Sequence, residues 1–138
     1  MIASILARLQ QSGTPFRLAG SAAELADVKD RPAQTPAVYV YVAREKSAPN
    51  ERVNGFLQRT EVDLGVVIVT SNLSGNNNAA ASAELDQAKA YVRKQLLGFV
   101  PAGTEEPLEH VEGELQQALS GTVWFEDVFS TAYYLKEA

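Results

Sequence analysis

The spacing of hydrophobic and polar positions changes near the middle of the chain, within residues 60–72. Acidic and apolar residues alternate over 61–64, and the segment then becomes continuously apolar over 66–69. Alternation is typical of a half-buried strand, whereas an unbroken β-branched run is typical of a strand covered on both faces. The pattern therefore predicts a central strand, with a helix packed on it near its C-terminal end.

The helix best placed to cover this strand follows it, over about 79–97. Apolar residues recur at helical spacing from Leu85 to Leu96, and basic residues lie toward the C-terminal end, where they suit the helix dipole. Gly98 is a natural C-terminal stop. A single apolar stripe over 1–11 predicts a second, N-terminal helix.

Between the N-terminal helix and the first clear strand, the signals are short. A brief alternation over 16–18 suits a short edge strand. The Ser-Ala-Ala-Glu sequence at 21–24 fits a capping box, and it predicts a helix of about two turns that runs through Val28. The proline-bounded segment 32–36 is expected to be a loop.

The AVYVYVA segment at 37–43 predicts a strand with valines on one face and Tyr39 and Tyr41 on the other. Tyrosines at this spacing can cover a second buried face of the sheet, or they can meet a partner subunit, where tyrosine is enriched. The polar segment 44–52 that follows predicts an exposed loop.

Two interpretations are open for the residues that lead into the central strand. We favour one long strand over 53–70, with a bend or bulge near Gly55. The alternative is a β-hairpin that turns at 54–55, because Asn-Gly is a strong turn signal. The polar segment before this dipeptide is a poor partner strand, which favours the first interpretation.

The C-terminal third predicts a β-hairpin, with a strand over 108–116, a turn at 120–121 and a long strand over 122–135. A bulge at the acidic pair 126–127 would let the alternation change phase. Together, the elements predict a single α+β domain over 1–138. We expect one mixed, mostly antiparallel sheet of about four to five strands, packed by the long helix and the N-terminal helix.

Composition limits the functional classes. The 138 residues carry a formal net charge of −5, so a broad basic face that holds nucleic acid is not expected. Cysteine is absent, which excludes disulfides and thiolate metal sites, and His110 alone cannot make a typical zinc site. The sequence has no membrane span and no signal-peptide pattern, so we expect a soluble product made in the cytoplasm.

No motif for catalysis or for a cofactor emerges, and we predict no enzyme activity. The nucleotide-binding glycine patterns are missing, and no G-x-S-x-G surrounds a serine. Glu61 and Asp63 share a strand face but are expected to form its solvated side. His110 lacks an obvious orienting partner, and Trp124 is expected to be a core or subunit contact rather than a platform for bases.

Six short stretches, in a fixed order over nearly the whole chain, carry a resemblance to a known family. They are MIAxIxARL at the start, PAVYV at 36–40, the 53–72 segment ending in GVVIVTxN, LLGFxP at 96–101, PLExxxGxL at 107–115 and VWFxDxFxTxY at 123–133. With this order and spacing, the chain resembles the tail-terminator proteins of long-tailed bacteriophages, including those encoded by Mu-like prophages.

The resemblance implies an α/β fold, with a sheet flanked by helices, and a structural role in the virion. Such proteins form a ring, usually of six subunits, on the head-proximal end of the tail tube. The ring stops tube growth and presents a surface for head-completion proteins. The implied partners are copies of the chain itself, the tail tube protein and a head-completion or connector protein. DNA only passes through the lumen, no membrane or cofactor is involved, and synthesis takes place in the host cytoplasm.

The exposed polar loops 44–57 and 71–78 are the expected sites of contact with other subunits or with the tube. The candidate interface residues are Tyr39, Tyr41, Arg44, Arg52, Asn54, Phe56, Asn72, Asn76 and Asn77. Two alternative functions stay open. One is a head–tail connector or tail-completion protein, and the other is a small binding module with no role in a virion.

Overall fold

The computed structural model describes residues 1–71, 78–119 and 121–137, without the side chains of 78–82 and 119. In chain order, its elements are α1 (Ile2–Leu9), β1 (Leu18–Gly20), α2 (Ala22–Ala26), β2 (Ala37–Ser47), β3 (Leu57–Ser71), α3 (Asn78–Leu96), β4 (Glu109–Leu119) and β5 (Thr122–Lys136). The strands form one five-stranded sheet in the order β1-β2-β3-β5-β4. Only the β1–β2 pair is parallel, so the predicted mixed, mostly antiparallel α+β sheet is confirmed.

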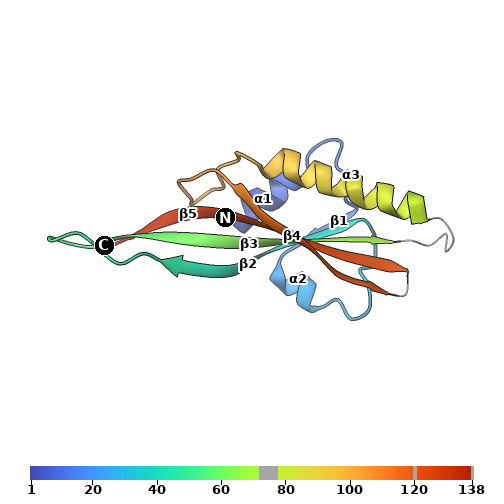
Figure 1. Cartoon of the computed structure of the whole chain (residues 1–138), viewed down its shortest axis with the longest axis horizontal. Helices are drawn as coiled ribbons and strands as arrows, with labels where there is room; N and C mark the ends of the chain where they lie inside the picture. The colour runs from blue at the N-terminus through green and yellow to red at the C-terminus, as the bar shows by residue number, and fades with distance from the viewer. Residues whose placement is uncertain (72–77, 120, 138) are drawn as a thin grey trace.

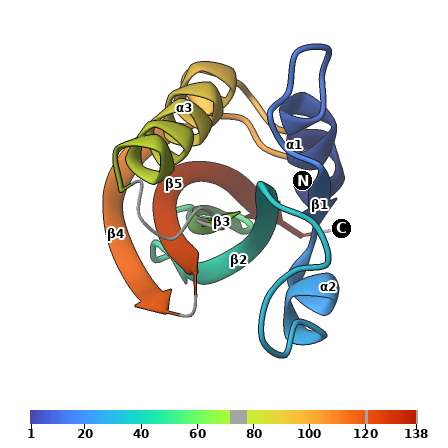
Figure 2. The same ribbon diagram turned by 90° about the vertical axis from the view of Figure 1, so that its right-hand side faces the viewer.

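The central strand is β3, as the hydrophobic pattern predicts. Its even-numbered residues from Val62 to Ile68 lie in the main core with α1 and α3, and we call this side of the sheet the α3 face. Val67 and Val69 lie in a second cluster with residues of α2 and its flanks, and we call that side the α2 face (Figure 2). The continuous apolar run therefore marks the part of β3 that helices cover on both sides.

The long helix α3 packs through the predicted stripe. Ala88, Val92 and Leu96 are fully or almost fully buried in the main core, and Ile5 and Leu9 of α1 join them. Each of the larger aliphatic side chains in this group contributes about 1.5–3 kcal/mol when it leaves water. The helix ends where the sequence predicts, before a glycine with a positive φ angle of 80° at position 98.

The short elements near the N-terminus lie close to their predicted positions. The edge strand β1 begins two residues later than expected, and α2 ends at Ala26 rather than at Val28. The Glu24 carboxylate accepts a hydrogen bond from the backbone N–H of Ser21 at 2.9 Å, as a capping box requires of its acidic member. It also accepts one from the Ser21 hydroxyl at 2.5 Å.

Strands β2, β3 and β5 continue past the helices and form a projection with the chain's C-terminal end beside it (Figure 1). We define the arm as residues 42–63 and 130–137. The prediction that 44–52 is an exposed loop is wrong for its first four residues, because β2 continues to Ser47 and pairs with β3 up to Thr60. Polar residues can form a strand over 44–47 because these residues are exposed and their backbone is paired with β3.

The predicted start of the central strand at residue 53 is also wrong. Strand β3 begins at Leu57, and residues 48–56 connect it to β2 as a long hairpin loop. Gly55 has a φ angle of 111°, a conformation that favours glycine. The hairpin alternative is therefore closer to the structure than the single long strand, although the connection has nine residues rather than two.

The C-terminal hairpin is confirmed by the antiparallel pairing of β4 with β5, whereas the predicted turn at 120–121 includes residue 120, which lies outside the described residues. The predicted bulge at 126–127 is wrong, because β5 pairs with β3 in an unbroken register from Thr122 to Lys136. The register shifts occur in β4, around Val111 and Gln116. Irregularities are common at sheet edges, and β4 is the edge strand whereas β5 is inside the sheet.

Candidate assembly surface

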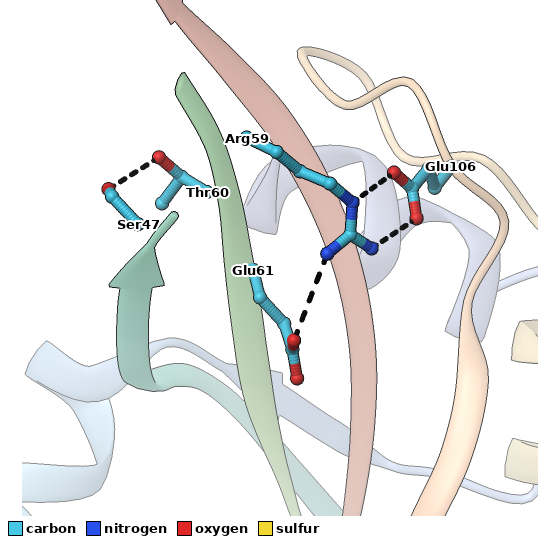
Figure 3. Close-up of polar contacts among 5 residues, drawn as sticks. All are labelled: Ser47, Arg59, Thr60, Glu61 and Glu106. Atoms are coloured by element: carbon cyan, nitrogen blue, oxygen red, sulfur yellow. Dashed lines mark hydrogen bonds and ion pairs between the residues drawn. The ribbon is translucent and has the colours of Figure 1, made fainter. Parts of the chain in front are cut away.

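Side-chain contacts brace the arm between its strands. The hydroxyls of Ser47 and Thr60 lie 2.7 Å apart across β2 and β3 (Figure 3). The Tyr133 hydroxyl on β5 donates to the Glu45 carboxylate of β2 at 3.0 Å. The arm is therefore held by side chains as well as by its strand ladder, although it extends beyond the helices.

The loop before β4 is fastened to the arm by an arginine. Arg59 donates to both carboxylate oxygens of Glu106, at 2.7 and 2.6 Å (Figure 3). These hydrogen bonds lower the pKa of Glu106 below its ordinary value, and they raise that of Arg59. Glu61 lies 3.9 Å from the same guanidinium. Both partners of the Arg59–Glu106 pair are partly exposed, so water screens it.

Asn50 fixes the conformation of the loop at the end of the arm. Its side-chain oxygen accepts from the N–H of Leu57 at 2.9 Å, and its amide nitrogen donates to the carbonyl of Gly55 at 3.0 Å. A second acceptor contact joins the same oxygen to the N–H of Arg52 at 3.3 Å. The loop is therefore closed by one side chain over residues 50–57.

This loop presents apolar side chains to solvent. Val53 is 96% exposed and Phe56 is 58% exposed. Two large apolar side chains on one projecting loop give a partner apolar area to bury, which makes this loop a candidate contact surface. Phe56 is one of the predicted interface residues, whereas Val53 is not. The signal that could have identified Val53 is an isolated valine between polar neighbours.

The predicted interface residues divide into four groups, of which Tyr41 alone is the last. Arg44, Arg52, Asn54 and Phe56 are exposed on the arm, Arg44 in β2 and the other three in the loop that follows it. Tyr39 is buried against α2, so its side chain offers no surface to a partner in this fold. Asn72, Asn76 and Asn77 lie outside the described residues.

Tyr41 lies between these extremes. It is half-buried on the α2 face, and its hydroxyl donates to the Glu126 carboxylate at 2.7 Å. Burial and this hydrogen bond raise its pKa to about 12. Its ring packs directly over Gly65, where an added Cβ would lie only 2.5 Å from the ring. Glu126 is therefore a partner of Tyr41 rather than a solvated edge charge.

Sequence reasoning missed a buried ionic cluster between α3 and the sheet. Asp127 is fully buried, and Arg93 of α3 donates to its two carboxylate oxygens at 3.0 and 2.9 Å. His110 Nε2 lies 3.0 Å from the same carboxylate, so the expectation that this histidine lacks a partner is wrong. Gly113 makes room for the cluster, because a Cβ there would lie 2.7 Å from an Asp127 oxygen.

The geometry of this cluster fits a structural role. Both Asp127 oxygens are engaged by the arginine, which joins the last turn of the long helix to the sheet. Among the described residues, no group of three or more histidine, aspartate or glutamate side chains is arranged to hold a metal ion. Within the same part of the chain, no helix is long and apolar enough to span a membrane.

A family model described as "Phage tail terminator protein" matches residues 2–138. The chain belongs to the phage tail terminator family. It is therefore a phage tail structural protein, and the resemblance carried by the six sequence stretches is confirmed. A search of curated protein sequences found no significant match.

A solved structure supports the fold of this tail terminator family member. A chain in a structure entitled "Virion of native gene transfer agent (GTA) particle" is similar with a TM-score of 0.62 and 15% sequence identity. The match covers 98% of the present chain and 95% of the other chain. The similarity therefore includes the arm and both helical layers, while the low identity restricts what it shows to the fold.

Proposed function

We propose that this protein caps the head-proximal end of the phage tail tube as a ring of six identical subunits. The ring ends polymerisation of the tube protein and offers a joining surface to the head-completion or connector protein. DNA only passes through its lumen, and the net charge of −5 disfavours retention of phosphate in that channel. Family membership supports this proposal, and the arm supplies a surface that suits it.

The observation that carries the proposal is the exposed apolar pair at the end of the arm. Val53 and Phe56 project on a loop that Asn50 holds in one conformation. A pre-ordered loop loses little conformational entropy when it binds, so apolar area buried there contributes efficiently to affinity. We assign this loop to the contact with the last ring of the tube.

The test is a tube-growth reaction with purified tube protein, in which tube lengths are measured by electron microscopy. The wild-type protein should stop growth, whereas the Val53→Ser, Phe56→Ser double variant should leave overlong tubes. The control is Leu97→Ser, Val100→Ser, which removes two other exposed apolar residues, after α3, and should still cap. A wild-type protein that leaves tube length unchanged would contradict the function, and capping by the arm variant would contradict the assigned loop.

A further inference from the structure

The sheet has two edges without a partner strand in the described part of the chain. Strand β4 is the outermost strand on one side over its full length, Glu109–Leu119. On the other side, β1 pairs with β2 only at residues 37–39, so the rest of β2, residues 41–47, is also open. Open edges present N–H and C=O groups that can pair with another strand, and proteins usually protect such edges.

The two open edges have compatible directions. Strand β2 is antiparallel to β3, β3 to β5, and β5 to β4, so β2 and β4 run in opposite directions. If a second copy lies beside the first with its sheet faces on the same sides, β4 of one copy meets β2 of the other as an antiparallel pair. This is the arrangement in which an edge extends a sheet by strand addition.

The two edges also have opposite charge on the same face. The register places Arg44 beside Asp63 and Lys46 beside Glu61, on the α2 face of β2. It places Glu112 beside Val128 and Glu114 beside Glu126, on the α2 face of β4. Each pair is two residues apart, which is the repeat of one strand face. Within the described residues, Arg44 and Lys46 form no ion pair, so their charges are available to a partner.

Exposed apolar residues lie on the opposite face of the same two edges. Val42 of β2 is 41% exposed and Leu115 of β4 is 54% exposed, and both belong to the α3 face. A register shift follows Val42 in β2, and another follows Leu115 in β4. The regular stretch of β4 between its two shifts, residues 112–115, is as long as the regular stretch of β2 that bears the basic pair, residues 44–47.

We propose that β4 of one copy pairs in antiparallel fashion with residues 41–47 of β2 in a second copy of this chain. Arg44 lies opposite Glu114 and Lys46 opposite Glu112 on the α2 face, and Val42 contacts Leu115 on the α3 face. The inference rests on the proposed ring, since it names the contact between adjacent subunits. The contact joins two different surfaces, and contacts of this kind close into a ring when their rotation allows.

Charge reversal tests this contact. In the first variant, Arg44→Glu and Lys46→Glu make both edges acidic; in the second, Glu112→Lys and Glu114→Lys make both edges basic. Each variant alone should lose self-association, because like charges then face each other across the strand pair. An equal mixture should associate again, since each acidic edge then meets a basic edge of the other variant. The control is Lys29→Glu, Arg31→Glu, which makes the same charge change at exposed positions after α2 and should associate like the wild type.

The register is tested by disulfide trapping, for which the chain is well suited because it contains no cysteine. A mixture of Lys46→Cys and Glu112→Cys proteins should form a cross-linked dimer, because directly opposite Cβ atoms lie within disulfide range. A mixture of Lys46→Cys and Gln117→Cys proteins is the control, since those positions would be several residues out of register. Equal cross-linking in both mixtures would overturn the proposed pairing.

Association is measured by light scattering for the free proteins and by electron microscopy on purified tubes. If association is regained only in the mixture of the two reversed variants, the edge contact is supported. This holds even if the wild-type protein does not cap tubes and the proposed function is contradicted. Self-association by either reversed variant would overturn the edge contact. A mixture that stays dissociated while the wild-type protein caps tubes would also overturn the edge contact, but it would not contradict the proposed function. A wild-type protein that associates in neither setting would also overturn it. Urea unfolding confirms that each variant folds.

Discussion

Two arginine–carboxylate pairs with similar geometry occupy different environments in this protein. Arg93 and Arg59 each make two hydrogen bonds to one carboxylate, but Asp127 is fully buried and Glu106 is partly exposed. Asp127→Asn should lower the free energy of unfolding by about 2–3 kcal/mol, because the fully buried carboxylate loses its charge-assisted hydrogen bonds to Arg93. Glu106→Gln should cost only about 0–1 kcal/mol, since water screens that pair. Urea unfolding measures both values, and equal losses would contradict the assigned difference.

The raised pKa of Tyr41 makes a second prediction at the residue scale. Its pKa of about 12 in the folded state exceeds the ordinary value of 10, so the unfolded chain loses this proton first as the pH rises. The stabilisation is complete below pH 10 and is lost progressively between about pH 10 and 12. Tyr41→Phe should therefore flatten the fall of stability in this window. Unfolding midpoints measured across the window test it, and an unchanged slope would refute the assignment.

The residues of these sites differ in how visible they are in the sequence. Tyr41 lies in a clear alternating strand, so its face could be predicted. The cluster of Asp127 with Arg93 and His110 could not, because it joins three elements and its acidic member follows another acidic residue. A pair such as Glu126-Asp127 is typical of an exposed position, and only the register of β5 shows that one of the two points under α3.

At the scale of elements, the loop of the arm provides the next prediction. Asn50→Ala removes the hydrogen bonds that close residues 50–57, each of which contributes about 1 kcal/mol. Trypsin cleavage after Arg52 should accelerate about tenfold, while the midpoint of global unfolding changes little. Asn54→Ala is the matched control, because Asn54 makes no side-chain hydrogen bond within the described part of the chain. Equal acceleration in both variants would show that Asn50 does not order the loop.

The elements themselves are predictable where burial dictates their pattern. The hydrophobic repeat locates β3, α3 and β5 because those segments contribute buried residues to the core. It fails for the second half of β2, where Arg44 to Ser47 is polar on both faces yet forms a strand through pairing with β3. A sequence pattern reports burial, and residues 44–47 are paired but exposed, so the length of β2 could not be read from the chain.

At the scale of the whole molecule, the opposite charges on its two open sheet edges have a measurable consequence. Because the proposed subunit contact combines two ion pairs with one small apolar contact, ring formation should weaken with salt. Exposed ion pairs contribute about 0.2–1 kcal/mol each. Raising the ionic strength from about 0.05 to 0.5 M, which shortens the screening length severalfold, should therefore weaken each contact by up to about tenfold. Sedimentation at several protein concentrations measures this change.

A matched variant separates this electrostatic contribution from a general effect of salt. Lys46→Met together with Glu112→Met replaces one cross-subunit ion pair by an apolar pair of similar reach, so its association should depend less on salt than that of the wild type. Lys29→Met together with Glu109→Met removes one charge of each sign without disturbing either proposed ion pair, and its salt dependence should match that of the wild type. If all three proteins respond equally to salt, the facing charges of β2 and β4 do not hold adjacent subunits together. A selective loss in the first variant would instead identify the sheet edges as the surfaces through which one chain recognises the next.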